Sequence, residues 1–329
     1  MSVIEVNHLS KSYRLHRKEP GLKGSIKSLF QRHYEEIIAV HNISFYVEEG
    51  EFLGLIGPNG AGKTTTLKLL SGILHPTHGE AHVLGFTPWQ RSEDFLRCIG
   101  FVMAQKGQLW WDIPPLDTFL LNKEVYGIPA NEFDRQLDEM VTMLEIGDRI
   151  AVQARKLSFG ERMKCEIIAS LLHNPDIIFL DEPTIGLDIV SQKQIWDFLK
   201  RYNRQYRKTI ILTSHYLGDV KKLCDRVIMI SQGEIAYDGA LSTLIHRYAP
   251  FKTLTIHFAD GVPTREAIES HGELLESLGD RVVLRVNRED TETAIMAIAS
   301  KFEIYNLLVE EPQIEDVMVN IFANLSPQA

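Results

Sequence analysis

Short apolar runs alternate with helical patterns over residues 1 to about 245. Three of these runs, each only four or five residues long, are Phe52–Ile56, Ile177–Leu180 and Thr209–Thr213. Runs of this length suit strands that are buried on both faces of a parallel sheet. Helices between such strands serve as the crossover connections. The pattern therefore predicts one α/β domain over residues 1–245.

Residues 16–38 interrupt this pattern and are predicted to be an insertion. The segment opens with the chain-breaking pair Pro20–Gly21. Its apolar residues then recur at helical spacing: Ile26, Leu29, Phe30 and Tyr34. Basic residues flank them: Lys23, Lys27 and Arg32. This arrangement predicts a short basic amphipathic helix inside the first domain.

Residues 246–329 follow a different pattern and are predicted to form a second, smaller domain. In chain order we expect a strand at 251–258, a helix at 264–271, strands at 273–279 and 281–287, a helix at 291–302, a strand at 303–311 and a helix at 313–325. The order β-α-β-β-α-β of the first six elements is typical of a ferredoxin-like fold. The last helix is an addition to that fold.

The composition is that of a globular protein, with 329 residues, 44% hydrophobic and 24% charged. No apolar run approaches the ~18–20 residues that span a bilayer. The amino terminus is polar where a secretion signal would be apolar. We therefore expect the chain in the cytoplasm, touching a membrane at most from its surface.

Charge and cysteine content narrow the possible partners. The net charge of −9 argues against broad nucleic-acid binding, which needs a basic face. The charge is uneven, because residues 11–34 are basic whereas residues 252–329 carry fourteen acidic and six basic side chains. Cys98, Cys165 and Cys224 share no metal-binding spacing, so no structural zinc is expected.

Residues 57–64, GPNGAGKT, fit the phosphate-binding pattern G-x-x-x-x-G-K-[ST] between an apolar strand and a helical run. Glycines let backbone N–H groups turn inward around phosphates, and the helix start favours negative charge. Lys63 would neutralise the β and γ phosphates of a nucleotide, and Thr64 would place its hydroxyl on Mg²⁺. The predicted nucleotide-binding residues are Gly57, Pro58, Asn59, Gly60, Ala61, Gly62, Lys63, Thr64 and Thr65.

Two adjacent acids, Asp181 and Glu182, end the apolar run that begins at Ile177. A buried strand that ends in carboxylates brings negative charge to the sheet edge where ligands bind in α/β folds. Asp181 suits coordination of Mg²⁺. Glu182 suits the polarisation of an attacking water molecule. Beside a phosphate-binding loop, these roles are favoured over a simple cap of the turn at Pro183.

A second anion site is predicted where Ser158 and Gly160 open a helical run, in the sequence LSFGER. This run resembles the signature of ABC (ATP-binding cassette) ATPases, which usually reads LSGGQ. Phe159 and Glu161 depart from that signature, whereas the serine and the second glycine are retained. Because the departures leave in place the groups that would contact a γ-phosphate, we expect ATP binding to be preserved. We expect the departures to change instead how tightly the subunits close or which partner they prefer.

Further residues strengthen the resemblance, which covers residues 1 to about 240. Gln105 is similar to the glutamine that joins the nucleotide and its Mg²⁺ to the permease, and Asp188 lies in the loop that crosses to the opposite subunit. His215 resembles the switch histidine at the γ-phosphate, and Tyr13 the aromatic residue that stacks on adenine. The resemblance implies a P-loop ABC cassette with a mixed sheet and a helical subdomain, binding ATP and Mg²⁺.

The resemblance also implies a function: an ATPase that powers transport through a separate transmembrane permease. Two cassettes, identical or different, would close around two ATP molecules at the cytoplasmic face of the membrane. The phosphate-binding loop looks most similar to cassettes of ABC-2-type exporters, which favours export. The alternative is a soluble ABC ATPase that acts on nucleic acid or ribosomes, which the acidic charge disfavours. The cargo is not specified by the sequence.

For each of three features, the sequence leaves two interpretations open. Trp110 and Trp111 either anchor the permease or fill the core. The basic insertion either contacts anionic lipid or the permease, or is a solvated surface helix. The carboxyl-terminal domain is either regulatory or dimer-forming.

Overall fold

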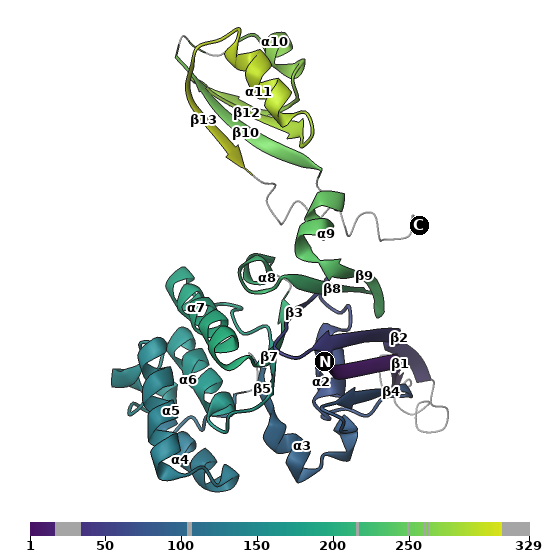
Figure 1. Cartoon of the computed structure of the whole chain (residues 1–329), viewed down its shortest axis with the longest axis vertical. Coiled ribbons are helices and arrows are strands. Elements are labelled where there is room, and N and C mark those ends of the chain that lie inside the picture. Colours follow the sequence, from purple (N-terminus) through teal and green to yellow (C-terminus); the bar gives the residue numbers. More distant parts are fainter. Residues whose placement is uncertain are drawn as a thin grey trace, which may run out of the picture. The chain divides into compact units, whose positions relative to one another are not determined.

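The computed structural model describes residues 1–16, 34–103, 107–214, 217–248, 250–259, 261 and 263–310 (Figure 1). Internal contacts divide the chain into two compact units, Met1–Ala240 and Leu241–Ala329. The second unit starts with helix α9 (Leu241–Tyr248). The domain boundary that the sequence analysis placed after residue 245 stays a prediction. Among the described residues, no helix is both long and apolar enough to cross a membrane.

The first unit is built on a six-stranded sheet with the order β5-β6-β7-β3-β8-β9. Its strands are β3 (Phe52–Ile56), β5 (Ile99–Met103), β6 (Ile177–Asp181), β7 (Thr209–Ser214), β8 (Arg226–Ser231) and β9 (Glu234–Ala240). Neighbours pair in parallel except β9, which runs antiparallel to β8. Every residue of β3 and β7 is buried, as expected for central strands covered on both faces. The predicted parallel sheet is confirmed.

A second, three-stranded antiparallel sheet has the order β2-β1-β4 and comprises β1 (Ser2–His16), β2 (Tyr34–Glu48) and β4 (His78–Val83). Helix α2 (Lys63–Leu70) contributes Leu67 and Leu70 to the apolar core shared by the two sheets. One sequence expectation was wrong here. Tyr34, placed in the basic helix, is the first residue of β2 and pairs with His16 of β1. Residues 17–33 of the predicted insertion lie outside the described residues.

The other helices of this unit are α3 (Glu93–Cys98), α4 (Pro115–Tyr126), α5 (Ala130–Met143), α6 (Phe159–Leu171), α7 (Ile189–Tyr206) and α8 (Leu217–Leu223). Short 3-10 turns lie at Pro88–Gln90, Gly147–Arg149 and Ala154–Lys156. Figure 1 shows α4, α5 and α6 gathered on the side of the six-stranded sheet opposite β1, β2 and β4. This layout matches the expected cassette, with a helical subdomain beside a mixed sheet core.

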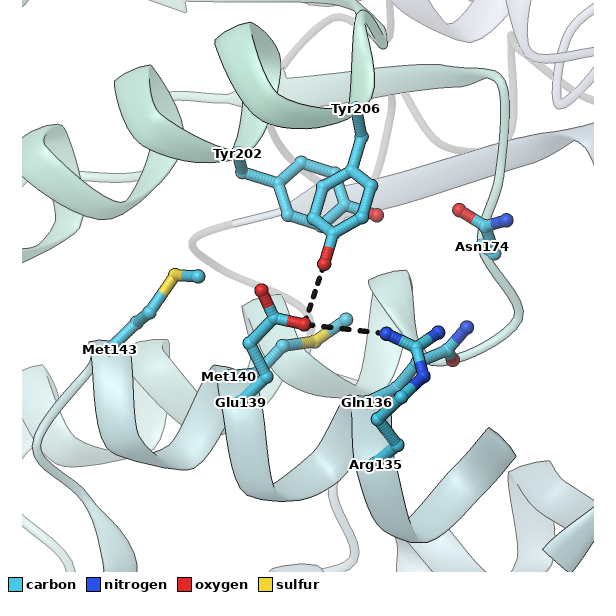
Figure 2. A pocket seen from close by; sticks show the side chains of 8 residues that line it. All are labelled: Arg135, Gln136, Glu139, Met140, Met143, Asn174, Tyr202 and Tyr206. Atoms are coloured by element: carbon cyan, nitrogen blue, oxygen red, sulfur yellow. Dashed lines mark hydrogen bonds and ion pairs between the residues drawn. The ribbon is translucent and has the colours of Figure 1, made fainter. Parts of the chain in front are cut away.

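Polar contacts join α5 of the helical subdomain to the end of α7 (Figure 2). The Tyr206 hydroxyl donates to Glu139 Oε2 at 2.6 Å, and Arg135 lies 3.6 Å from the same carboxylate oxygen. Tyr202 is buried next to this pair, and its ring lies 4.9 Å from that of Tyr206. The cavity between them is about 40 Å³, which suits a water molecule rather than a ligand.

The second unit contains a four-stranded antiparallel sheet with the order β11-β12-β10-β13. Its elements after α9 are β10 (Phe251–Phe258), α10 (Arg265–Glu269), β11 (Glu273–Leu278), β12 (Arg281–Asn287), α11 (Thr291–Ala299) and β13 (Ile304–Glu310). Leu254 and Ile256 of β10 share a core with Leu284 of β12 and Ile298 of α11. This order and pairing are those of a ferredoxin-like fold, which confirms the predicted class. The final helix predicted at 313–325 lies outside the described residues.

Candidate functional site

Several of the predicted site residues meet at the carboxyl edge of the six-stranded sheet. Asp181 of β6 lies opposite Thr213 of β7, and Ile56 of β3 lies opposite Ser214. Because the strands are parallel, the loops that leave β3, β6 and β7 emerge at the same edge. The phosphate-binding loop and the carboxylate pair are thereby brought together.

The loop between β3 and α2 depends on glycine at two close backbone approaches. Gly57 and Gly62 have φ angles of 151° and 110°. A Cβ at Gly57 would lie 2.1 Å from the carbonyl oxygen of Ile230, and one at Gly62 would lie 2.3 Å from that of Ala39. No side chain fits these positions, so the loop backbone stays tightly folded ahead of α2.

Lys63 opens α2 and reaches back over the loop. Its ammonium group donates to the carbonyl oxygens of Gly57 at 2.8 Å and Pro58 at 3.0 Å. Burial lowers the pKa of Lys63, and the nearby carboxylates of Glu182 and Asp181 partly oppose this shift. A buried ammonium group at the start of a helix is chemically suited to binding an anion.

Asp181 joins three elements through one oxygen atom. Its Oδ1 accepts hydrogen bonds from the Thr64 hydroxyl of α2 at 2.8 Å and the Thr213 hydroxyl of β7 at 2.7 Å. The next residue, Glu182, has a φ of 52°, which is unusual for any residue except glycine. Its N–H donates to the Thr213 hydroxyl and carbonyl oxygen at 3.1 Å and 3.2 Å.

The predicted second anion site lies at the start of α6, which Ser158 caps. The Ser158 hydroxyl accepts from the Glu161 N–H at 3.2 Å, and the Glu161 carboxylate accepts from the Ser158 N–H at 2.8 Å. Arg149 lies 2.9 Å from the same carboxylate. The hydrogen bond from the Ser158 backbone, above all, lowers the pKa of Glu161. Glu161 therefore acts locally as a capping-box residue.

Gly160 brings this helix start against the loop that contains Asp188. A Cβ at Gly160 would lie 2.4 Å from the Ser191 hydroxyl oxygen. That hydroxyl donates to Asp188 at 2.6 Å, and Asp188 caps α7 by accepting from the Ser191 N–H at 2.9 Å. The signature-like segment and the Gly186–Asp188 loop are therefore neighbours in one subunit.

The remaining predicted residues are Tyr13, Gln105 and His215. Tyr13 is half-buried on β1, opposite Ile37 of β2, with the Lys11 ammonium 5.3 Å from its ring centre. Gln105 and His215 lie outside the described residues. Met103 ends β5 and Ser214 ends β7 shortly before them.

The sequence did not single out two buried acids. Asp219 of α8 is 1% exposed and accepts hydrogen bonds from Thr184 and Ser214. Glu166 of α6 is 4% exposed and accepts from the backbone N–H groups of Gln108 at 2.7 Å and Leu109 at 3.2 Å. Burial raises the pKa of Glu166. An acid inside the apolar run 163–172 is a signal that could have identified Glu166. Nothing in the sequence distinguishes Asp219 from an ordinary helix acid.

This fold and edge define the class of protein: a P-loop nucleotide-binding cassette of the mixed α/β type. A protein-family model described as ABC transporter matches residues 40–185. The chain is 34% identical over 215 residues to the ABC transporter ATP-binding protein NatA of Bacillus subtilis (strain 168), covering 65% of this chain and 87% of that protein. It is 31% identical over 257 residues to the Nod factor export ATP-binding protein I of Burkholderia thailandensis, covering 78% and 84%.

Solved structures agree. A dimeric, post-hydrolysis ATP-binding cassette, MJ0796 bound to ADP and Pi, superposes with a TM-score of 0.60 at 26% identity, covering 72% of this chain and 98% of that one. The chain therefore belongs to the ABC transporter ATP-binding proteins. It is the ATP-binding and ATP-hydrolysing subunit of an ABC transporter.

Proposed function

We propose that two cassettes close around two ATP molecules, each held between the phosphate-binding loop of one subunit and the Ser158–Gly160 segment of the other. The observation that carries this proposal is the convergence of Lys63, Thr64 and Asp181 at one sheet edge, with a second capped helix start at Ser158. The dimeric state of the similar MJ0796 cassette supports it.

Within each site, residues 57–65 bind the phosphates and Tyr13 stacks on the adenine. Thr64 and Asp181 offer the oxygen ligands that Mg²⁺ prefers, and their 2.8 Å contact supports the proposal that both bind one ion. Gln105 is proposed as a further ligand. Bound Mg²⁺ would neutralise charge on the phosphate oxygens. Glu182 polarises the attacking water, His215 contacts the γ-phosphate, and Asp188 crosses to the opposite subunit.

We propose a separate transmembrane permease as the partner and Trp110–Trp111 as its docking residues. Their side chains are 63% and 61% exposed, so the core-filling interpretation does not hold for either. The Arg162 guanidinium lies 4.9 Å from the Trp111 ring, which ties this surface to α6. Export is the proposed direction, supported by the name of the Nod factor relative. The relatives described above are transport proteins, which disfavours the soluble alternative.

The site of action is proposed to be the cytoplasmic face of the membrane. The basic residues Lys23, Lys27 and Arg32 would bind anionic headgroups there. Replacing all three with glutamine should reduce sedimentation with anionic vesicles, and unchanged sedimentation would reject this contact. Residues 246–329 are proposed to regulate the cassette or to join two copies.

The function is tested with Glu182→Gln in the full chain. This variant should bind ATP, stop hydrolysing it and accumulate as an ATP-bound dimer on gel filtration. Hydrolysis at the unmodified rate would remove Glu182 from its proposed role. A pull-down from detergent-solubilised membranes should recover a polytopic protein that lacks its own cassette. Recovery only with ribosomal or DNA-associated proteins would favour the soluble alternative.

A further inference from the structure

A buried carboxylate outside the nucleotide-binding set joins three segments of the first unit. Asp219 of α8 is 1% exposed. Its Oδ2 accepts from the Thr184 hydroxyl at 2.6 Å and the Ser214 hydroxyl at 3.0 Å, and its Oδ1 accepts from the Trp196 indole N–H at 2.8 Å. The two hydroxyl donors are themselves only 3% exposed. Buried hydrogen bonds to a charged acceptor hold their donors firmly in place.

The donors lie next to the residues proposed to carry the chemistry. Thr184 is in the loop that follows Glu182, and Ser214 is the last residue of β7, directly before His215. Trp196 belongs to α7, whose Gln192 amide also donates to the carbonyl oxygens of Thr184 and Leu187 at 3.3 Å each. Glu182, Thr184, Ser214 and Asp219 line one cavity of about 350 Å³.

Glu182 needs such support because its backbone is strained. Its φ of 52° lies in the left-handed region, which residues with a Cβ rarely adopt. Thr213 holds the residue on its amino-terminal side through two hydrogen bonds to its N–H. On the other side, its carbonyl oxygen accepts from the Ile185 N–H at 3.3 Å, and Thr184 is fixed by Asp219. Strained residues of this kind persist only where surrounding contacts enforce them.

We propose that Asp219 is a positioning residue for ATP hydrolysis. By holding Thr184 and Ser214 it keeps Glu182 in its strained conformation and fixes the end of β7 relative to it. This inference rests on the proposed role of Glu182. It identifies Asp219, on helix α8, as the group that sets the geometry of Glu182.

The test compares Asp219→Asn with unmodified full-length protein in single-turnover ATP hydrolysis, for the hydrolysis rate, and in steady-state hydrolysis, for the KM. The amide keeps the shape but presents an NH₂ group where one acceptor oxygen was. We expect the hydrolysis rate to fall about 10- to 100-fold, as for other small misplacements of a catalytic group. The KM for ATP should stay within about twofold, because the phosphate-binding loop is untouched.

The matched control is Asp225→Asn, which changes an exposed acid just beyond α8, and this variant should hydrolyse ATP normally. An unchanged rate, or a rise in KM alone, would overturn the proposal.

A second comparison separates positioning from general support of the fold. In a Glu182→Gln background, Asp219→Asn should not lower the residual hydrolysis further, because the residue that it positions is already disabled. A further loss by the same factor would show that Asp219 acts independently of Glu182 and would overturn the inference.

If Asp219→Asn fails to fold, Thr184→Val is used for the same comparisons. If Glu182→Gln alone hydrolyses ATP normally, the proposed role of Glu182 fails, and this inference fails with it. If Glu182→Gln is inactive while Asp219→Asn is unaffected, only the inference fails.

Discussion

Thr64 donates a hydrogen bond to Asp181 across 2.8 Å, although the two residues are 117 positions apart in the chain. The threonine follows Lys63 in α2, and the aspartate ends β6, which β7 separates from β3 in the sheet. Each residue is ordinary by itself. Together they place two oxygen atoms next to Lys63, and we propose this pair as ligands of a nucleotide-bound Mg²⁺.

Asp181→Asn should lower ATP turnover by roughly 100-fold, because removing the carboxylate charge removes several kcal/mol of metal-dependent stabilisation. Turnover of the variant should be almost as low with Mg²⁺ as that of the unmodified protein in EDTA. The measurement is steady-state phosphate release over a Mg²⁺ titration. Full activity at saturating Mg²⁺ would contradict Asp181 as a metal ligand.

Lys63→Ala should abolish ATP turnover and weaken ATP binding, because the buried ammonium above the loop would be lost. We expect a fall in turnover of at least about 100-fold. Lys68 of the same helix is the matched control, since it is half-buried and lies in the last turn of α2, whereas Lys63 opens the helix and contacts the loop carbonyls. Comparable losses in Lys63→Ala and Lys68→Ala would mean that the effect is on α2 and not on phosphate binding.

Gly107→Ala should destabilise the loop that leads to Trp110 and Trp111. A Cβ at Gly107 would lie 2.0 Å from Oε1 of Glu166, and Glu166 is held by the N–H groups of Gln108 and Leu109. We expect a loss of about 1–3 kcal/mol in the free energy of unfolding. Urea unfolding of both single variants and of Gly107→Ala with Glu166→Ala checks this. The double variant should lose less than the sum, and strict additivity would argue against the clash.

Glu161→Gln should leave α6 capped but strengthen closure on ATP. Glutamine preserves the capping box with Ser158, whereas it removes a negative charge next to the hydroxyl proposed to meet the γ-phosphate. In a Glu182→Gln background, this change should lower the ATP concentration needed for half-maximal dimer formation by several fold, on the order of 1 kcal/mol. Glu161→Ala is the control, because it removes both charge and cap. A higher ATP requirement for Glu161→Gln would contradict the charge argument.

Deleting residues 250–329 should leave a cassette that folds and binds ATP. The first unit has its own core, in which Ile4, Leu53 and Leu67 are fully buried. Thermal unfolding with and without ATP and Mg²⁺ measures the outcome, and a stabilising shift on adding nucleotide is expected. An insoluble fragment without ATP binding would reject the two-domain organisation.

The sequence alone determined those features whose information is local. The pattern at residues 57–65 is contiguous, so the sequence alone could propose its glycines, lysine and threonine as nucleotide-binding residues. The buried strands are continuous apolar runs, and the carboxyl-terminal order of strands and helices specified a ferredoxin-like fold that the sheet order β11-β12-β10-β13 confirms. The motif at Ser158 likewise needs only its own helix start.

Only the tertiary structure decided the features that depend on distant partners. Tyr34 fits a helical spacing, but its cross-strand pairing with His16 makes it part of β2. The exposure of Trp110 and Trp111 could not be read from their hydrophobicity. Asp219 looks like a surface acid until α8 brings it to Thr184 and Ser214, 35 and 5 positions away in the chain. Local pattern specifies backbone preference, whereas burial and hydrogen-bond partners arise only when segments far apart in sequence pack together.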